Sequence, residues 1–68
     1  MRIKDIRDII EVLVSNGIPF TGELHKEYTS VIFLKGGEEV VVLPDGRLEY
    51  KGVSYRGALK EAFGERLL

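Results

Sequence analysis

The sequence predicts an α+β fold, a three- to four-stranded antiparallel sheet with N- and C-terminal helices on one face. Apolar residues recur at intervals of three and four near both ends of the chain, which is typical of amphipathic helices. The middle holds short β-branched and aromatic runs separated by glycine and proline, which is typical of strands and turns. At 68 residues, we expect a single α-β-β-β-(β)-α domain over residues 1–68.

The first helix is predicted over the segment that ends at Asn16-Gly17. Its apolar stripe repeats every three or four residues and comprises Ile3, Ile6, Ile9, Ile10, Leu13 and Val14. Asn16-Gly17 is a strong stop signal because glycine takes the left-handed conformation of a helix end without steric cost. Pro19 follows and prevents the helix from continuing.

The central part of the chain is predicted to form an antiparallel meander. The candidate strands are Phe20 to His25, Tyr28 to Leu34, Glu38 to Leu43, Leu48 to Tyr50 and the short run Val53 to Tyr55. Gly36-Gly37 suits a tight hairpin turn. Pro44-Asp45-Gly46 predicts a second turn. Proline fixes its own φ angle, aspartate can cap the local backbone, and glycine accepts a positive φ. We therefore expect three or four of these five runs to pair in an antiparallel meander.

The last element is predicted to be helical. Leu59, Ala62, Phe63 and Leu67 share one face at helical spacing. Gly64 interrupts the pattern and costs about 1 kcal/mol relative to alanine, so we expect the helix to fray or end there and residues 65–68 to be mobile. The predicted core comprises Ile6, Ile9, Ile10, Leu13, Val31, Phe33, Val40, Val42, Leu48, Leu59 and Phe63.

Composition excludes several classes of protein. The chain has no cysteine, so we expect neither a disulfide framework nor a thiolate metal site. No apolar run approaches the 18 or so residues of a membrane-spanning helix. The N-terminus enters a charged amphipathic pattern rather than a signal peptide, so we expect a cytoplasmic protein. One Asn, no Gln and many charged residues favour an origin in a hot environment.

Chain length also bears on function. Ordering 68 residues costs on the order of 100 kcal/mol of conformational entropy. A domain of this size buries only about 60% of its unfolded surface. The core must therefore use nearly every large apolar side chain, which leaves little for an enclosed active site. We expect a protein that acts by contact with another macromolecule and is not an enzyme.

Few side chains offer catalytic chemistry. His25 is the single histidine, so a Ser-His-Asp arrangement would have to include it, and its polar surroundings favour a solvated residue. Glu38 and Glu39 are adjacent, so in a strand they point to opposite faces, and a solvated hairpin is expected there. Gly36-Gly37 lacks the spacing of a phosphate-binding loop. We expect no cofactor and no metal ion.

A basic and aromatic set in the C-terminal third suggests a nucleic-acid-facing surface, in which cations contact phosphates and rings stack on bases. Its members are Arg47, Tyr50, Lys51, Tyr55 and Arg56. The predicted element order resembles that of double-stranded-RNA-binding domains. The run from Asp45 to Tyr55, followed by Ala62 and Gly64, resembles the end of the RAMA domain, which implies a DNA-facing accessory role. The net charge of -1 reduces the basic character of this set.

The last helix offers a different binding element. Leu59 and Phe63 lie one turn apart, so both can enter a hydrophobic groove on a protein partner. Their spacing is similar to the peptide motif that docks on the sliding clamp PCNA. Arg56 stands at the glutamine position of that motif, and Ala62 stands at its first aromatic position.

Size, composition and this motif together resemble the small archaeal (Thermococcales-type) inhibitors of PCNA. The resemblance implies a non-catalytic regulator of DNA replication or repair that occupies the peptide-docking groove of the clamp. The partner-binding residues that it implies are Arg56, Leu59, Lys60, Ala62, Phe63 and Leu67. Two alternatives stay open: the nucleic-acid-facing module, and a helix whose apolar residues simply pack in the core.

Overall fold

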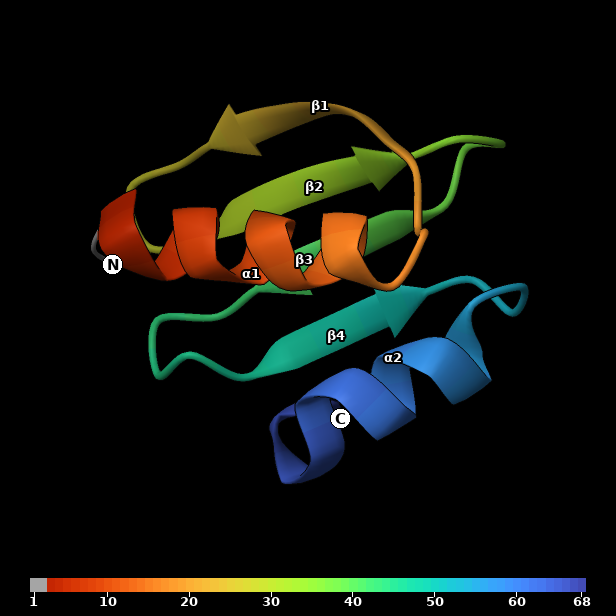
Figure 1. Cartoon of the computed structure of the whole chain (residues 1–68). Helices are drawn as coiled ribbons and strands as arrows, with labels where there is room; N and C mark the ends of the chain where they lie inside the picture. Colours follow the sequence, from red (N-terminus) through yellow and green to blue (C-terminus); the bar gives the residue numbers. More distant parts are fainter. Residues whose placement is uncertain (1–2) are drawn as a thin grey trace.

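A computed structural model describes residues 3–68, with side chains from Ile6 onward, as two helices and a four-stranded sheet (Figure 1). The elements are α1 (Ile3–Ser15), β1 (Phe20–His25), β2 (Ser30–Leu34), β3 (Glu39–Val42), β4 (Leu48–Lys51), α2 (Arg56–Phe63) and the short 3₁₀ helix η1 (Gly64–Arg66). The strands pair antiparallel in the order β1-β2-β3-β4. The predicted α+β class is confirmed.

The first helix forms and ends as its sequence pattern predicts. Ile6, Ile9 and Leu13 are buried at helical spacing, whereas the intervening polar side chains are exposed. The helix stops because Gly17 takes a φ of 70° and the next amide, that of Ile18, turns back to the carbonyl of Leu13 at 3.0 Å. The side chain of Ile3, a predicted member of the stripe, lies outside the described residues.

Both helices cover the same face of the sheet. Ile32, Val40 and Tyr50 lie opposite one another across β2, β3 and β4, so their side chains share that face. Together with the buried residues of α1 and α2 they form one core cluster. Figure 1 shows α1 running along the sheet and α2 beside β4. The Cα radius of gyration is 10.7 Å, close to the roughly 11 Å of a compact chain of this length.

The structure corrects part of the predicted core. The prediction included Val31 and Phe33 in the core and omitted Ile32 and Leu34, but the register turns Ile32 and Leu34 towards the helices. Val31 is buried, as predicted, yet it lies with Phe33 on the opposite face of the sheet, outside the core cluster. Four consecutive apolar residues contain no alternation that could fix the phase of a strand. Ile10 only borders the core, and the prediction missed Ile18, Ile32, Leu34 and Tyr50.

The C-terminal segment also differs from the prediction. Residues 53–55 form a turn that leads into α2 instead of a strand. The helix ends before Gly64, as predicted, but residues 65–68 are held in place. The amide of Leu68 donates to the carbonyl of Leu48 at 2.8 Å, and the Arg66 guanidinium donates to the carbonyl of Gly46 at 3.0 and 3.1 Å. The C-terminus therefore covers part of the free edge of β4.

No helix within the described residues is long and apolar enough to span a membrane.

Candidate protein-binding surface

The helix residues predicted to dock on a partner are engaged within the domain. Leu59 is 0% exposed and Phe63 is 7% exposed, because the apolar face of α2 packs on the sheet. Ala62 and Leu67 are partly buried against the same core. Arg56 and Lys60 are exposed. Leu59 and Phe63 cannot enter a groove on another protein while α2 stays packed, so their placement agrees with the alternative in which they are core residues.

The residues predicted to face nucleic acid do not form one open surface. Tyr50 is 5% exposed, and the guanidinium of Arg56 lies over its ring at 5.3 Å from the centroid. Lys51 follows Tyr50 in β4 and therefore points to the opposite face of the sheet. Tyr55 is partly buried against the core, and Arg47 pairs with Asp45 at 2.9 Å. The Tyr50 ring, one of the two stacking rings of that prediction, is therefore covered.

A hydrogen-bonded network around Glu38 holds the turn that begins α2. The Glu38 carboxylate accepts a hydrogen bond from the Tyr50 hydroxyl. It also accepts hydrogen bonds from the backbone N–H groups of Val53 and Ser54, both at 3.2 Å. The Tyr50 hydroxyl in turn accepts the N–H of Tyr55 at 2.9 Å. Glu38 closes the predicted hairpin between β2 and β3, but its carboxylate is bonded within the domain and the residue is only partly exposed, rather than freely solvated as expected. The sequence gives no signal for the network because its partners lie 12–16 residues away.

The network shifts the protonation equilibria of its two central groups. The hydrogen bond from Tyr50 lowers the pKa of Glu38; partial desolvation opposes this shift, and the amides of Ser54 and Val53 assist it. Burial raises the pKa of the Tyr50 hydroxyl, and the neighbouring Glu38 carboxylate raises it further. Both shifts favour the same state, a charged carboxylate that accepts from a neutral hydroxyl.

Gly52 allows this network to close. A Cβ atom on residue 52 would lie 2.6 Å from Cδ of Glu38 and 2.8 Å from Cζ of Tyr50. Both distances are far below van der Waals contact, so any larger residue must displace the carboxylate or the ring.

His25 joins a second, smaller network in β1. Its Nδ1 lies 3.1 Å from Oγ of Ser30, and its Nε2 lies 2.8 Å from Oε1 of Glu23. These are the residue types of a hydrolytic triad, but Ser30 is only 3% exposed, so its hydroxyl is not accessible to a substrate. The arrangement therefore orders the β1–β2 hairpin without presenting a nucleophile. Among the residues that the structure describes, no three His, Asp or Glu side chains gather to hold a metal ion.

The outer side of β1 is an open edge of the sheet. The amide of Lys26 donates to the carbonyl of Thr29 at 2.8 Å, which fixes the alternation of the β1–β2 ladder. Leu24 accordingly directs its N–H and C=O towards β2, whereas Glu23 and His25 direct theirs away from the sheet. Within residues 3–68, no strand pairs with that outer side.

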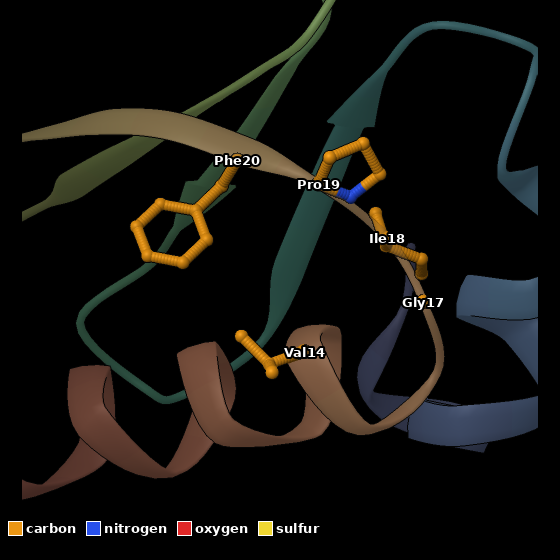
Figure 2. A pocket seen from close by; sticks show the side chains of 5 residues that line it. All are labelled: Val14, Gly17, Ile18, Pro19 and Phe20. Carbon is orange, nitrogen blue, oxygen red and sulfur yellow. The ribbon is translucent and has the colours of Figure 1, made fainter.

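An apolar hollow lies at the start of this edge (Figure 2). It is lined by Val14, Gly17, Ile18, Pro19 and Phe20, has a volume of about 370 Å³ and is open to solvent. It forms because α1 ends at Gly17 and the chain reverses through Pro19 into β1. Val14 is 61% exposed at its rim. The hollow suits an aliphatic or aromatic side chain from outside the domain.

Comparison with protein-family models, with curated proteins and with solved structures found no match to this chain. Fold and surface together define a small α+β domain in which an apolar hollow adjoins an open strand edge.

Phe63→Ala should destabilise the domain by about 3 kcal/mol or more, because it leaves a cavity between α2 and the sheet. Lys60→Ala, on the exposed side of the same helix, should change stability by less than about 0.5 kcal/mol. Urea denaturation followed by circular dichroism measures both. Near-wild-type stability of Phe63→Ala would contradict the placement of Phe63 in the core.

Gly52→Ala should lower the free energy of unfolding by roughly 1–3 kcal/mol, because its methyl group collides with the Glu38–Tyr50 pair. Gly57→Ala is the matched control. It lies in α2 with no atom within 4 Å of the added Cβ, and it should stabilise the helix by up to about 1 kcal/mol. Denaturation curves that move in opposite directions confirm the prediction, and an unchanged Gly52→Ala curve refutes it.

Glu38→Gln should lose a pH-dependent part of the stability. Because folding lowers the pKa of Glu38, its stabilisation is fully present above the ordinary glutamate value of about 4.3 and is lost as pH falls through the folded pKa. The wild-type and variant unfolding free energies should therefore differ most near neutral pH and converge in acid. Glu39→Gln removes a neighbouring charge but none of these hydrogen bonds and serves as the control.

Proposed function

We propose that this chain is a small non-catalytic protein-binding domain that takes up an extended segment of a partner along the open edge of β1. The observation that carries the proposal is the position of the apolar hollow at the start of that edge. An added strand gains affinity from main-chain hydrogen bonds, and pockets for its alternate side chains supply specificity. Glu23 and His25 offer the main-chain groups, and the hollow offers the pocket.

A strand added to the open edge of β1 would also reach the apolar hollow. Alternate side chains of an added strand fall on the helix-covered side of the sheet. Phe20 packs against the core on that side, and the hollow opens between it and Val14 (Figure 2). A partner residue opposite the Phe20 end of β1 would therefore project towards the hollow. Since its lining is apolar, the proposal calls for an aliphatic or aromatic residue at that position.

A protein partner is favoured over a nucleic acid because the Tyr50 ring is covered and the Arg56 guanidinium is bonded to the carbonyl of Gly52 at 3.3 Å. The resemblance to small archaeal clamp inhibitors makes PCNA the first partner to test and DNA replication or repair the first process. In this proposal the clamp contacts β1 and the hollow instead of Leu59 and Phe63, which stay in the core.

The test uses purified archaeal PCNA and a display library of extended peptides as probes, with the intact domain as bait. Val14→Lys places a charge at the rim of the hollow and should weaken a selected ligand by at least about tenfold, or 1.4 kcal/mol. Val53→Lys is the matched control, because Val53 is 81% exposed in the turn before α2. Titration calorimetry measures the affinities.

Changes in the NMR chemical shifts of the backbone amides on titration show which residues of the domain contact the ligand. The proposal expects the largest changes at Glu23 and His25, with little change along α2. A ligand that shifts the amides of α2 and spares those of β1, or equal losses for the two lysine variants, would refute it.

A further inference from the structure

We infer that the open edge of β1 is self-complementary and pairs antiparallel with β1 of a second copy, on a twofold axis at Leu24. The sheets of the two copies then become one continuous sheet. The pairing rests on the backbone and charge pattern of β1 and on the apolar row that crosses the sheet at Leu24. Its consequence for partner binding rests on the proposed function, since both would use the same edge.

The backbone of β1 suits this arrangement. Glu23 and His25 direct their N–H and C=O groups away from β2, whereas Leu24 between them bonds towards β2. In the inferred register, Glu23 lies opposite His25 of the second copy, and the two residues exchange both main-chain hydrogen bonds. Symmetry repeats the exchange on the other side of the axis. Leu24 then lies opposite its own copy as a non-hydrogen-bonded pair, the geometry in which side chains approach most closely.

Charge selects this register among those that symmetry allows. Residues that lie opposite each other must have their side chains on the same face of the sheet. The twofold axis must therefore lie midway between one residue and the same residue of the second copy, not between two successive residues. An axis at Glu23 sets two carboxylates opposite each other, and an axis at His25 sets Glu23 opposite Glu27 of the second copy. An axis at Gly22 falls beside the β-bulge between Phe20 and Gly22. The axis at Leu24 avoids both carboxylate pairs and sets the bonded Glu23–His25 pair of one copy beside that of the other, with imidazole opposite carboxylate on each side.

The sheet face away from the helices gives further support. Leu24 is 46% exposed on that face, and in register beside it lie Val31 of β2 and Val41 of β3. Pairing at Leu24 joins this apolar row to the same row of the second copy. The exposed leucine then meets an identical side chain, which removes apolar surface from water on both copies.

Self-association would regulate the proposed binding site by competition. A second copy on Glu23 and His25 occupies the same main-chain groups that a partner strand needs. The same register brings the β1–β2 turn of one copy, with its exposed Tyr28, towards the Phe20 end of the other. A dimer would therefore cover the edge, and a partner would bind only the dissociated chain.

Cysteine cross-linking tests the axis. The chain has no cysteine of its own, so Leu24→Cys introduces a single thiol on the inferred twofold axis. Under mild oxidation it should form a disulfide dimer roughly tenfold faster or more than Val53→Cys, which meets its copy only by collision. Equal rates for the two variants would overturn the inference.

Analytical ultracentrifugation of the cysteine-free chain tests the pairing without oxidation. The wild-type chain should show twice the monomer mass at high concentration. Glu23→Lys should shift it to monomer, and Glu23→Lys combined with His25→Glu should restore the dimer, because the exchanged charges face each other in the same register. Monomer at every concentration, or no recovery in the double variant, overturns the inference.

The two proposals fail separately. If the chain is monomeric but peptide binding still depends on Val14, the dimer is wrong and the binding function stands. If the Leu24-centred dimer forms and no ligand shifts the amides of β1, the dimer stands and the binding function is wrong. Glu23→Pro removes an outward N–H without touching the β1–β2 ladder and should abolish dimer formation, whereas a dimer that survives it is not formed through this edge.

Discussion

The structure depends on burying one face of a four-stranded sheet under two short helices. An eight-residue helix such as α2 has little stability of its own, so it persists only while its apolar face is packed. Leu59 and Phe63 supply that face and lie in the core. A motif that resembles a docking peptide in the sequence is therefore required for folding. The apolar faces of the helices are therefore occupied, whereas the outer edge of β1 and the hollow at the end of α1 stay accessible.

The parts of the fold that follow from local sequence were predictable. Gly17 ends α1 because the stop signal acts through its own backbone conformation, and α2 ends at Gly64 for the same reason. The phase of β2 was not predictable, since Val31 to Leu34 are all apolar and both faces bury some of them. The turn at residues 53–55 was missed because Glu38, a distant residue, satisfies its amides. The alternation of residues 53–55 predicts a strand, but it carries no information about a hydrogen-bond acceptor as distant in the sequence as Glu38.

The candidate binding surface was predictable only in part. That β1 lies at an edge follows from the chain order of a meander, and that Glu23 and His25 share a face follows from strand alternation. The hollow was not predictable, because it depends on how the end of α1 stands over Phe20. The role of Gly52 was not predictable either, because it also depends on residues that are distant in the sequence. Its sequence context is that of an ordinary turn glycine, whereas its role is to admit Glu38 against Tyr50.

The two edges of the sheet differ in how far the rest of the chain covers them. An open strand edge is a template for pairing with other chains, and proteins usually cover it, charge it or distort it. On β4 the C-terminus does so through Leu68 and Arg66, at the cost of ordering the last residues of a small domain. On β1 the described residues offer only a bulge and one carboxylate, Glu23. An edge left open next to an apolar hollow, in a domain that covers part of its other edge, supports the proposed pairing with another polypeptide.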